Sequence, residues 1–339
     1  MRWDNLKVDQ EQETKLPGYK DPAVVRTFDA PEALGINFYE VNAHSAINKV
    51  PKQSRMPFRF TINPYRGCSH ACVYCFARPS HTYLDLNARE DFERQIVVKV
   101  NAPEVVRAEL ARPRWKHEHV ALGTNTDPYQ WVEGRYKLMQ GIWEAMRDFA
   151  NPCSVLTKSP LLLRDLKLMQ EIAERTEFSA NLSVPTLDEK AWRATEPHTP
   201  HPRKRLEAVA ELNRAGIPTG ILIAPLMPGI NDAPEQVEEI LGLAAEAGAV
   251  SVGGVGLHLR GEVRDIWFDW LREHRPDLLS RYEELYERGA YMKPAERERL
   301  SRMTKRGGGP PGRFRGRDPA PGRKPPPEQP PTTRQPKLF

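Results

Sequence analysis

Cysteine is scarce in this chain, which has four cysteines in 339 residues. Three of them, Cys68, Cys72 and Cys75, follow the spacing C-x3-C-x2-C. A disulfide framework pairs an even number of cysteines across separate elements, so this group of three excludes one. What remains is metal ligation or a chance cluster of buried thiols. Because the segment is polar and lies between Pro64 and Pro79, we predict metal ligands.

Long apolar runs are also missing. No stretch approaches the roughly 18 apolar residues that a membrane span needs. The first residues, Met1 to Lys7, lack the apolar region of a signal peptide. We therefore expect a soluble, cytoplasmic protein without a membrane partner, and reduced thiols agree with that compartment.

A strong overall charge is absent once the last residues are set aside. Residues 305–339 hold nine Lys or Arg and two Asp or Glu, a net charge of +7. The whole chain carries +5, so residues 1–304 carry 5 − 7 = −2. Nucleic-acid binding must therefore depend on the tail or on local basic patches, because the folded part has no basic field of its own.

The cysteine segment itself suggests the chemistry. An iron–sulfur cubane normally takes four cysteines, so three leave one iron without a protein ligand. Gly67 lets the backbone turn into the loop, and the small residues Ser69 and Ala71 let it wrap closely. A zinc site is the alternative, with His70 as the fourth ligand, but neighbouring loop residues rarely complete a tetrahedron alone.

This segment resembles the radical S-adenosylmethionine (SAM) enzymes, whose pattern includes an aromatic residue before the last cysteine, here Tyr74. The string Asn-Pro-Tyr-Arg-Gly-Cys at 63–68 is similar to the DNA repair photolyase-like branch related to spore photoproduct lyase. The resemblance implies a [4Fe-4S] cluster, SAM chelated to the open iron, and an electron donor such as flavodoxin or ferredoxin. It also implies a 5′-deoxyadenosyl radical that abstracts hydrogen from the substrate.

Strands and helices alternate along the middle of the chain, which implies a parallel sheet with right-handed crossovers. We expect strands at 58–62, 120–123, 154–157, 178–184, 219–224 and 250–257, with an extra one at 96–100. Helices are expected at 101–112, 136–149, 161–174, 187–194, 202–215 and 234–247. Six such units predict a partial (β/α)6 TIM-like barrel, which matches the family that the cysteines indicate.

Four regions follow from this pattern. Residues 1–57 are predicted to be an irregular N-terminal extension, 58–262 the barrel, and 263–304 C-terminal helices packed on the barrel. Residues 305–339 contain ten prolines and almost no aliphatic residues, so we expect a disordered basic tail. Its end, Gln335 to Phe339, resembles the Q-x-x-L-F peptides that dock on the replication sliding clamp, although so short a motif also arises by chance.

Ligands of parallel α/β proteins gather at the carboxyl ends of the strands. After the second barrel strand, Thr124, Asn125 and Asp127 stand where the family contacts the amino group of SAM; ordinary turn chemistry is the alternative. Lys158, after the third strand, is predicted to pair with the SAM carboxylate, as a similar lysine does in the photoproduct lyase branch. An ordinary surface lysine is the competing interpretation.

Two further strands offer groups to the nucleoside part of SAM. Asn181 and Ser183 alternate along the fourth strand and can bond ribose hydroxyls, or they can form a satisfied polar pair inside the barrel. After the fifth strand, Ala224 begins an irregular loop whose backbone can meet the adenine edge.

The hydrogen-atom donor is not evident. Photoproduct lyase uses an additional cysteine at the end of the second strand, whereas this chain has Ala121 to Thr126 there without a cysteine. Repair of thymine photodimers by the same route is thus not expected. Candidate catalytic residues are Tyr129, Tyr83 and His258. The spare Cys153 is predicted to pack in the core.

Three functions are compatible with the sequence. The first is a radical SAM enzyme acting on DNA or nucleotides. The second is a radical SAM enzyme acting on a peptide or small metabolite. The third is a non-enzymatic metal-binding nucleic-acid module. A single basic face would favour nucleic acid over a metabolite; the cations that would form it are Arg59, Arg66, Arg78, Arg112, Arg114, Lys116, Arg203, Lys204 and Arg205.

Overall fold

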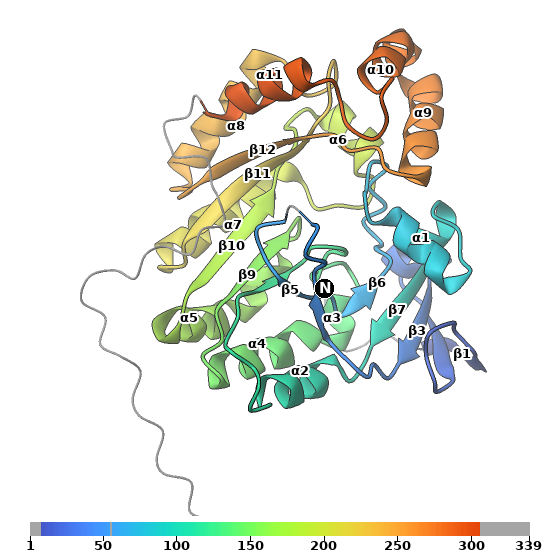
Figure 1. The fold of residues 1–339 in the computed structure, drawn as a ribbon, viewed down its shortest axis with the longest axis vertical. Coiled ribbons are helices and arrows are strands. Elements are labelled where there is room, and N and C mark those ends of the chain that lie inside the picture. The colour runs from blue at the N-terminus through green and yellow to red at the C-terminus, as the bar shows by residue number, and fades with distance from the viewer. Residues whose placement is uncertain (1–7, 55, 306–339) are drawn as a thin grey trace, which may run out of the picture.

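The computed structural model describes residues 8–54 and 56–305 (Figure 1). A seven-stranded sheet has the order β12-β11-β10-β9-β8-β5-β4. Its strands are β4 (Ile47–Lys49), β5 (Phe60–Ile62), β8 (Val120–Leu122), β9 (Cys153–Thr157), β10 (Phe178–Ser183), β11 (Thr219–Leu226) and β12 (Val252–Gly256). All neighbours pair in parallel except β4, which is antiparallel to β5. The predicted six-stranded parallel barrel is thus confirmed.

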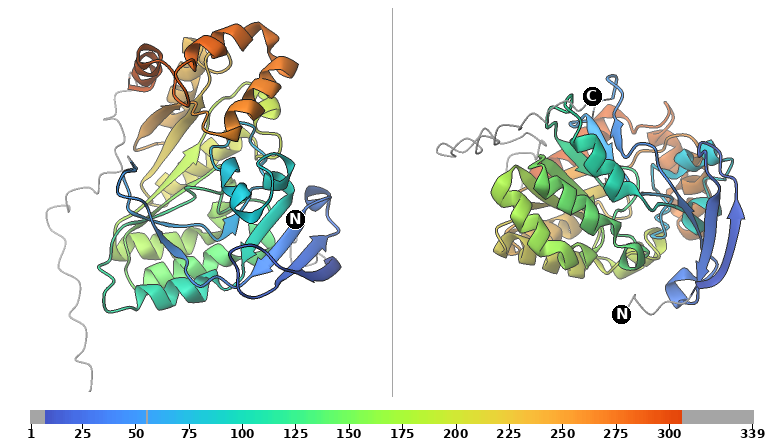
Figure 2. Two further views of the ribbon diagram at one scale, coloured as in Figure 1. Left: turned by 45° about the vertical axis from the view of Figure 1, so that its right-hand side comes forward. Right: turned by 90° about the horizontal axis from the view of Figure 1, so that it is seen from below.

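Helices connect these strands and cover one face of the sheet (Figures 1 and 2). They are α2 (Ala102–Leu110), α3 (Glu133–Tyr136), α4 (Leu138–Asp148), η4 (Pro160–Asp165), α5 (Leu166–Arg175), α6 (Glu189–Thr195), α7 (Pro202–Arg214) and α8 (Pro234–Glu246). Each predicted helix is present, with ends shifted by a few residues. Gly216 and Gly248 follow α7 and α8 with φ of +81° and +68°, as expected after a helix end.

The two faces of the barrel sheet differ in chemistry. The helix-covered face is apolar, with Leu182 and Ile221 paired in register and Val155 on the same face, all of them buried. The other face carries mainly small or polar residues, namely Ser154, Lys158, Asn181, Ser183, Gly220, Ser251 and Gly253, with Leu156 and Leu222 between them. Because side chains alternate along a strand, this second set lines the inside of the partial barrel. A polar interior suits a site that binds a charged ligand.

The N-terminal region differs from the irregular extension that we predicted. Strands β1 (Val8–Thr14), β2 (Ala23–Phe28) and β3 (Asn37–Val41) form a second sheet with β7 (Gln95–Lys99) and β6 (Tyr65–Arg66), in the order β1-β2-β3-β7-β6. It lies beside the barrel (Figures 1 and 2). Buried Phe38, Ile96 and Val98 pack on one side of it. The extra strand predicted at 96–100 is therefore real, but it belongs to this sheet.

The C-terminal segment is helical, as expected. It contains α9 (Glu262–His274), η5 (Pro276–Leu278), α10 (Leu279–Leu285) and α11 (Pro294–Lys305). In α9, Trp267 and Trp270 stack with ring centroids 4.8 Å apart. Helix α11 covers β12 so closely that a Cβ at Gly254 would lie 2.4 Å from Thr304. The remaining short helices are η2 (Pro31–Ala33), η3 (Arg78–Leu84) and α1 (Glu90–Arg94).

Two further sequence expectations concern membrane spans and the end of the chain. No helix within 8–54 and 56–305 is both long and apolar enough to cross a bilayer. The basic tail beyond Lys305 and its Gln335 to Phe339 motif fall outside the described residues. They remain predictions from sequence.

Gly123 marks a close approach that the fold requires. It follows β8 with φ of +80°, and a Cβ there would lie 1.9 Å from the Leu156 carbonyl oxygen. Gly216 has φ of +81° with nothing within 4 Å. We expect Gly216→Ala to lower the free energy of unfolding by about 1–2 kcal/mol, the cost of the left-handed backbone. Gly123→Ala should cost at least about 3 kcal/mol, because the clash adds to it. Urea denaturation measures both; equal losses would contradict the close approach.

Candidate active site at the cysteine loop

The cysteine loop begins at the end of β6, where Gly67 turns the backbone with φ of +83°. The Cys68 N–H donates to the Phe92 carbonyl at 2.9 Å, and the Ser69 N–H donates to Gln130 Oε1 at 2.9 Å. The Val73 N–H donates to the Thr195 carbonyl at 3.0 Å, after α6. The loop is thus tied both to the N-terminal sheet and to the carboxyl end of the barrel.

Arg78 fixes the cysteine loop through hydrogen bonds to its backbone carbonyls. Its guanidinium donates to the carbonyls of Ala71 and Cys72 at 3.1 and 3.0 Å, and it pairs with Glu93. The residue is 1 % exposed, so it cannot contact nucleic acid. Arg78 is therefore not one of the surface cations that the sequence had led us to expect.

The three thiols lie near one another and near charged groups. Cys68 and Cys72 are buried, Cys75 is partly exposed, and all three are free. Burial and the charge of Cys68 raise the pKa of Cys75 to about 11. Burial and the Glu196 carboxylate raise the pKa of Cys72 well above its usual range, while the Lys158 ammonium opposes both shifts. Iron would have to displace these protons on binding.

The side chains favour a cluster over a single ion. Within the described residues, no three His, Cys, Asp or Glu side chains form a group that could hold one metal ion. In a cubane each thiolate binds a different iron, so the ligands need not converge on one point. His70 Nδ1 lies 3.4 Å from Asp127 Oδ2, and the ring also neighbours the Cys68 thiol. The three soft thiolates therefore suit an iron–sulfur cluster, with Cys68, Cys72 and Cys75 as its ligands.

A buried charge network joins the loop to the barrel. The Tyr74 hydroxyl donates to Glu196, which also accepts from Arg205 at 2.6 Å and from Lys158 Nζ at 2.9 Å. Glu196 and Arg205 are fully buried, and the Lys158 side chain is 15 % exposed. Burial alone would raise the pKa of Glu196, but Arg205 and Lys158 lower it to about 2. The carboxylate is therefore ionised at neutral pH.

Four of the predicted SAM-binding residues meet in this network. Lys158 Nζ also donates to Ser183 Oγ at 2.7 Å and lies 5.7 Å from the centre of the Tyr74 ring. Ser183 Oγ in turn donates to the Ala224 carbonyl at 3.0 Å. Tyr74, Lys158, Ser183 and Ala224 thus form one connected row across the ends of β9, β10 and β11.

The predicted amino-group ligands lie at the end of β8. Asp127 accepts from Thr157 Oγ1 at 2.6 Å and from the Lys158 N–H at 2.7 Å, so it fixes the turn after β9. Burial would raise the pKa of Asp127, but His70 and these donors lower it. Thr124 and Asn125 are half-buried, and the Asn125 N–H donates to Asn63 Oδ1 at 3.1 Å.

The side chain of Asn181 makes no hydrogen bond within the described part of the chain. It is 8 % exposed. A Cβ at Gly220 would lie 2.8 Å from its Oδ1, so the amide projects across the inner face of β11. Its donors and acceptor remain free for a ligand.

The three candidate catalytic residues occupy different surroundings. Tyr129 is fully buried, and its hydroxyl donates to Asp165 at 2.9 Å and accepts from Trp143 at 2.6 Å. Tyr83 is 79 % exposed on η3. His258 follows β12 and stacks on Tyr291 with ring centroids 4.3 Å apart. Burial and the positive charge of Arg260 lower the pKa of His258, so its imidazole is neutral at pH 7.

Glu196 and Arg205 are site residues that sequence reasoning did not assign. Glu196 comes just after α6 and Arg205 lies within α7, so neither follows a strand directly. Their pairing depends on α6 and α7 meeting, with Arg205 also donating to the Thr199 hydroxyl at 2.7 Å. The sequence signal that could have indicated this pair is that a proline-rich turn separates the two residues.

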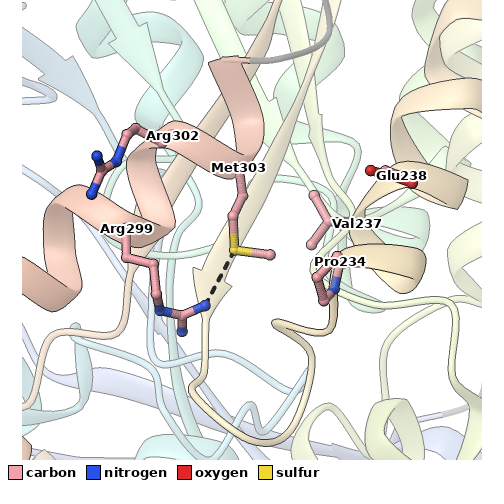
Figure 3. Close-up of a pocket in the computed structure, with 6 residues that line it drawn as sticks. All are labelled: Pro234, Val237, Glu238, Arg299, Arg302 and Met303. Carbon is pink, nitrogen blue, oxygen red and sulfur yellow. Dashed lines mark hydrogen bonds between the residues drawn. The ribbon is translucent and has the colours of Figure 1, made fainter.

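A cavity of about 330 Å³ lies elsewhere, between α8 and α11 (Figure 3). Pro234, Val237 and Glu238 line it from α8, and Arg299, Arg302 and Met303 from α11. Arg299 already pairs with Asp232 and Glu296. Because none of its lining residues belongs to the cysteine loop or the charge network, this cavity is separate from the candidate site.

Comparisons with known proteins agree with this geometry. The family model described as "Radical SAM superfamily" matches residues 62–244. An uncharacterized protein of Mycobacterium tuberculosis (strain ATCC 25618 / H37Rv) is 48 % identical over 285 residues, which cover 84 % of each chain. The radical SAM Nalpha-GlyT isomerase of Pseudomonas phage M6 is 25 % identical over 67 % of this chain and 45 % of its own.

Among solved structures, spore photoproduct lyase complexed with dinucleoside spore photoproduct is similar in fold. Its TM-score is 0.58 at 14 % sequence identity, covering 80 % of this chain and 78 % of that one. At that identity the likeness concerns the fold, which is the partial barrel described above.

Proposed function

This chain belongs to the radical SAM superfamily, and from that premise we propose that its substrate is DNA or a nucleotide. Family membership makes it an enzyme with a [4Fe-4S] cluster and SAM, and it excludes the non-enzymatic module considered from sequence. The bound cluster and SAM supply a 5′-deoxyadenosyl radical that abstracts hydrogen. The enzyme needs a reductant, for which we propose flavodoxin or ferredoxin.

The observation that carries the nucleotide proposal is an aromatic and cationic rim at the carboxyl end of β12. Tyr291 is 61 % exposed, its ring stacks on neutral His258, and the Arg297 guanidinium lies 5.8 Å from the ring centre. Phe76, on the cysteine loop, is 56 % exposed. Exposed aromatic rings beside cations are the surfaces on which unstacked bases bind.

Residues from several strand ends would then bind and orient SAM. Lys158, held by Glu196 and Ser183, presents a fixed positive charge to the SAM carboxylate. Asn181 offers its free amide to the ribose, and the Ala224 segment meets the adenine. Thr124 and Asn125 accept from the SAM amino group, with Asp127 fixing the turn. Fixed groups in a site that excludes water orient SAM before the reaction.

A peptide or small metabolite is the second candidate, and one observation favours it. The cations named from the sequence do not form one face. Arg78 and Arg205 are buried, whereas Arg112, Arg114 and Lys116 precede β8, at the end of the barrel sheet opposite the cysteine loop. This set of cations therefore forms no large basic surface for duplex DNA, which favours a small substrate.

The experiment that separates these candidates follows hydrogen transfer. After anaerobic loading with iron and sulfide, the enzyme is mixed with SAM, dithionite and deuterated oligonucleotides, with and without ultraviolet damage. We expect deuterium in 5′-deoxyadenosine, with its yield raised several-fold by the nucleic acid. Formation of 5′-deoxyadenosine that neither nucleic acid nor nucleotides change, and that carries no deuterium, would exclude this substrate class.

A further inference from the structure

Two cations share one face of the N-terminal sheet beside the cysteine loop. Arg66 on β6 pairs with Val97 on β7, and Lys99 lies two residues further along β7. Side chains of paired residues point to the same face, as do those at i and i+2. Arg66 and Lys99 are thus diagonal neighbours, roughly 7–8 Å apart at their Cα atoms.

Neither cation has an acidic partner among the described residues. Lys99 Nζ donates to the Asn63 carbonyl at 2.9 Å, and no ion pair is formed by Lys99 or Arg66. The more buried arginines behave differently, because Arg78 and Arg205 each pair with a glutamate. Two neighbouring, half-buried positive charges thus have no carboxylate partner within the described residues.

The arrangement costs stability. Burial and the charge of Arg66 lower the pKa of Lys99 to about 8, so at neutral pH the ammonium is still mostly protonated. Like charges that are partly removed from water repel one another strongly. An anionic ligand bound between the two cations would relieve this repulsion.

The pair also lies beside the site. Arg66 is followed by Gly67 and Cys68, at the start of the cysteine loop. Asn63, which accepts from Lys99, also accepts the Asn125 N–H at the end of β8. Both cations are half-buried and so keep some contact with solvent.

We propose that Arg66 and Lys99 bind a phosphate of the nucleotide substrate next to the cluster loop. The guanidinium can take two phosphate oxygens at once, and the ammonium adds a point charge. This site depends on the proposed function, because only a nucleotide or nucleic acid brings a phosphate together with a reactive base or sugar. A single phosphate here would position the substrate without a wide basic surface.

The test uses the full chain after cluster loading and the variant Lys99→Met. Anisotropy of a labelled single-stranded oligonucleotide should show about a tenfold weaker binding, and the slope of log Kd against log salt should fall by about 1. SAM affinity, measured by equilibrium dialysis, should not change. Lys167→Met, exposed on α5, is the matched control and should alter none of these.

The outcomes separate the site from the function. If the parent protein binds oligonucleotide and Lys99→Met binds it equally well, this site is wrong while the proposed substrate class stands. If the variant loses SAM affinity instead, the cations serve SAM and the proposal is overturned. If the parent binds no nucleic acid or nucleotide, both proposals fail. Competition by millimolar inorganic phosphate that Lys99→Met abolishes supports the site and identifies the phosphate as the recognised group.

Discussion

Cys72→Ser is expected to abolish 5′-deoxyadenosine formation while leaving the protein folded. Cys72 is 6 % exposed, and the loop around it is held by backbone hydrogen bonds that the substitution does not touch. With two thiolates left, a second iron loses its protein ligand and the cluster is not retained. The activity loss should exceed the roughly 10–100-fold that changes outside the ligand shell cost. Iron and sulfide analysis, visible absorption and product yield measure it.

Cys153→Ala is the matched control for that loss. Cys153 is 1 % exposed at the start of β9, where burial raises its pKa above the usual range. The substitution should lower the free energy of unfolding by about 1 kcal/mol and leave cluster content unchanged. If Cys153→Ala lost the cluster, or Cys72→Ser kept it with full activity, the ligand assignment would be wrong.

Glu196→Gln is expected to be strongly destabilising. The glutamine keeps the shape of the side chain but removes the charge that Arg205 and Lys158 share. Breaking a buried pair by neutralising one partner costs about 3–5 kcal/mol, a large part of the 5–15 kcal/mol that holds an average protein together. SAM affinity should also fall, because Lys158 and Tyr74 lose their common anchor. Urea denaturation and equilibrium dialysis measure the two effects.

Glu189→Gln provides the comparison on the surface. Glu189 pairs with Arg193 one helical turn away, with both side chains about two-thirds exposed at 64 % and 66 %. Loss of such a pair should cost no more than about 0.5 kcal/mol. Equal destabilisation by the two substitutions would show that the buried network contributes nothing special.

The pH dependence of stability gives the same network a second signature. The pKa of Glu196 lies at about 2 in the folded chain, below its ordinary 4.5. Its contribution is therefore complete above pH 4.5 and is lost as the pH falls from 4.5 towards 2. The parent should lose stability more steeply than Glu196→Gln over that window. Parallel curves would place the carboxylate outside the network.

The barrel could be predicted from sequence because its strands carry the signal locally. Segments such as 178–183 and 219–224 lie between predicted helices, and both form strands, β10 and β11. Apolar and polar residues alternate through 178–183, which is the period of two that a strand requires. Only the ends moved, since pairing decides them: β5 starts at Phe60, opposite Val120, although Phe58 is also apolar.

The N-terminal sheet could not be predicted in this way. Strand β1 exposes nearly all of its seven residues, so it shows no alternation of apolar and polar side chains. Its sheet is completed by β7, which lies more than fifty residues further along the chain and pairs with β3. A strand defined by such distant pairing leaves little local trace.

The same distinction between local signals and distant contacts applies to the residues of the site. The cysteines and the strand-end residue Lys158 could be named as candidates from sequence because their positions follow from spacing and topology. Glu196 and Arg205 were not assigned, because their roles arise from contacts between α6, α7 and the loop. Arg78 was taken for a surface cation because a charge in sequence does not reveal its burial.

The central claim is that Cys68, Cys72 and Cys75 hold a [4Fe-4S] cluster whose open iron receives SAM. Electron paramagnetic resonance of the anaerobically loaded, reduced protein, recorded before and after addition of SAM, tests it most directly. We expect a [4Fe-4S] signal whose g values shift when SAM is added, and no such signal in Cys72→Ser. A loaded protein without that signal, or with one that SAM leaves unchanged, would contradict the account.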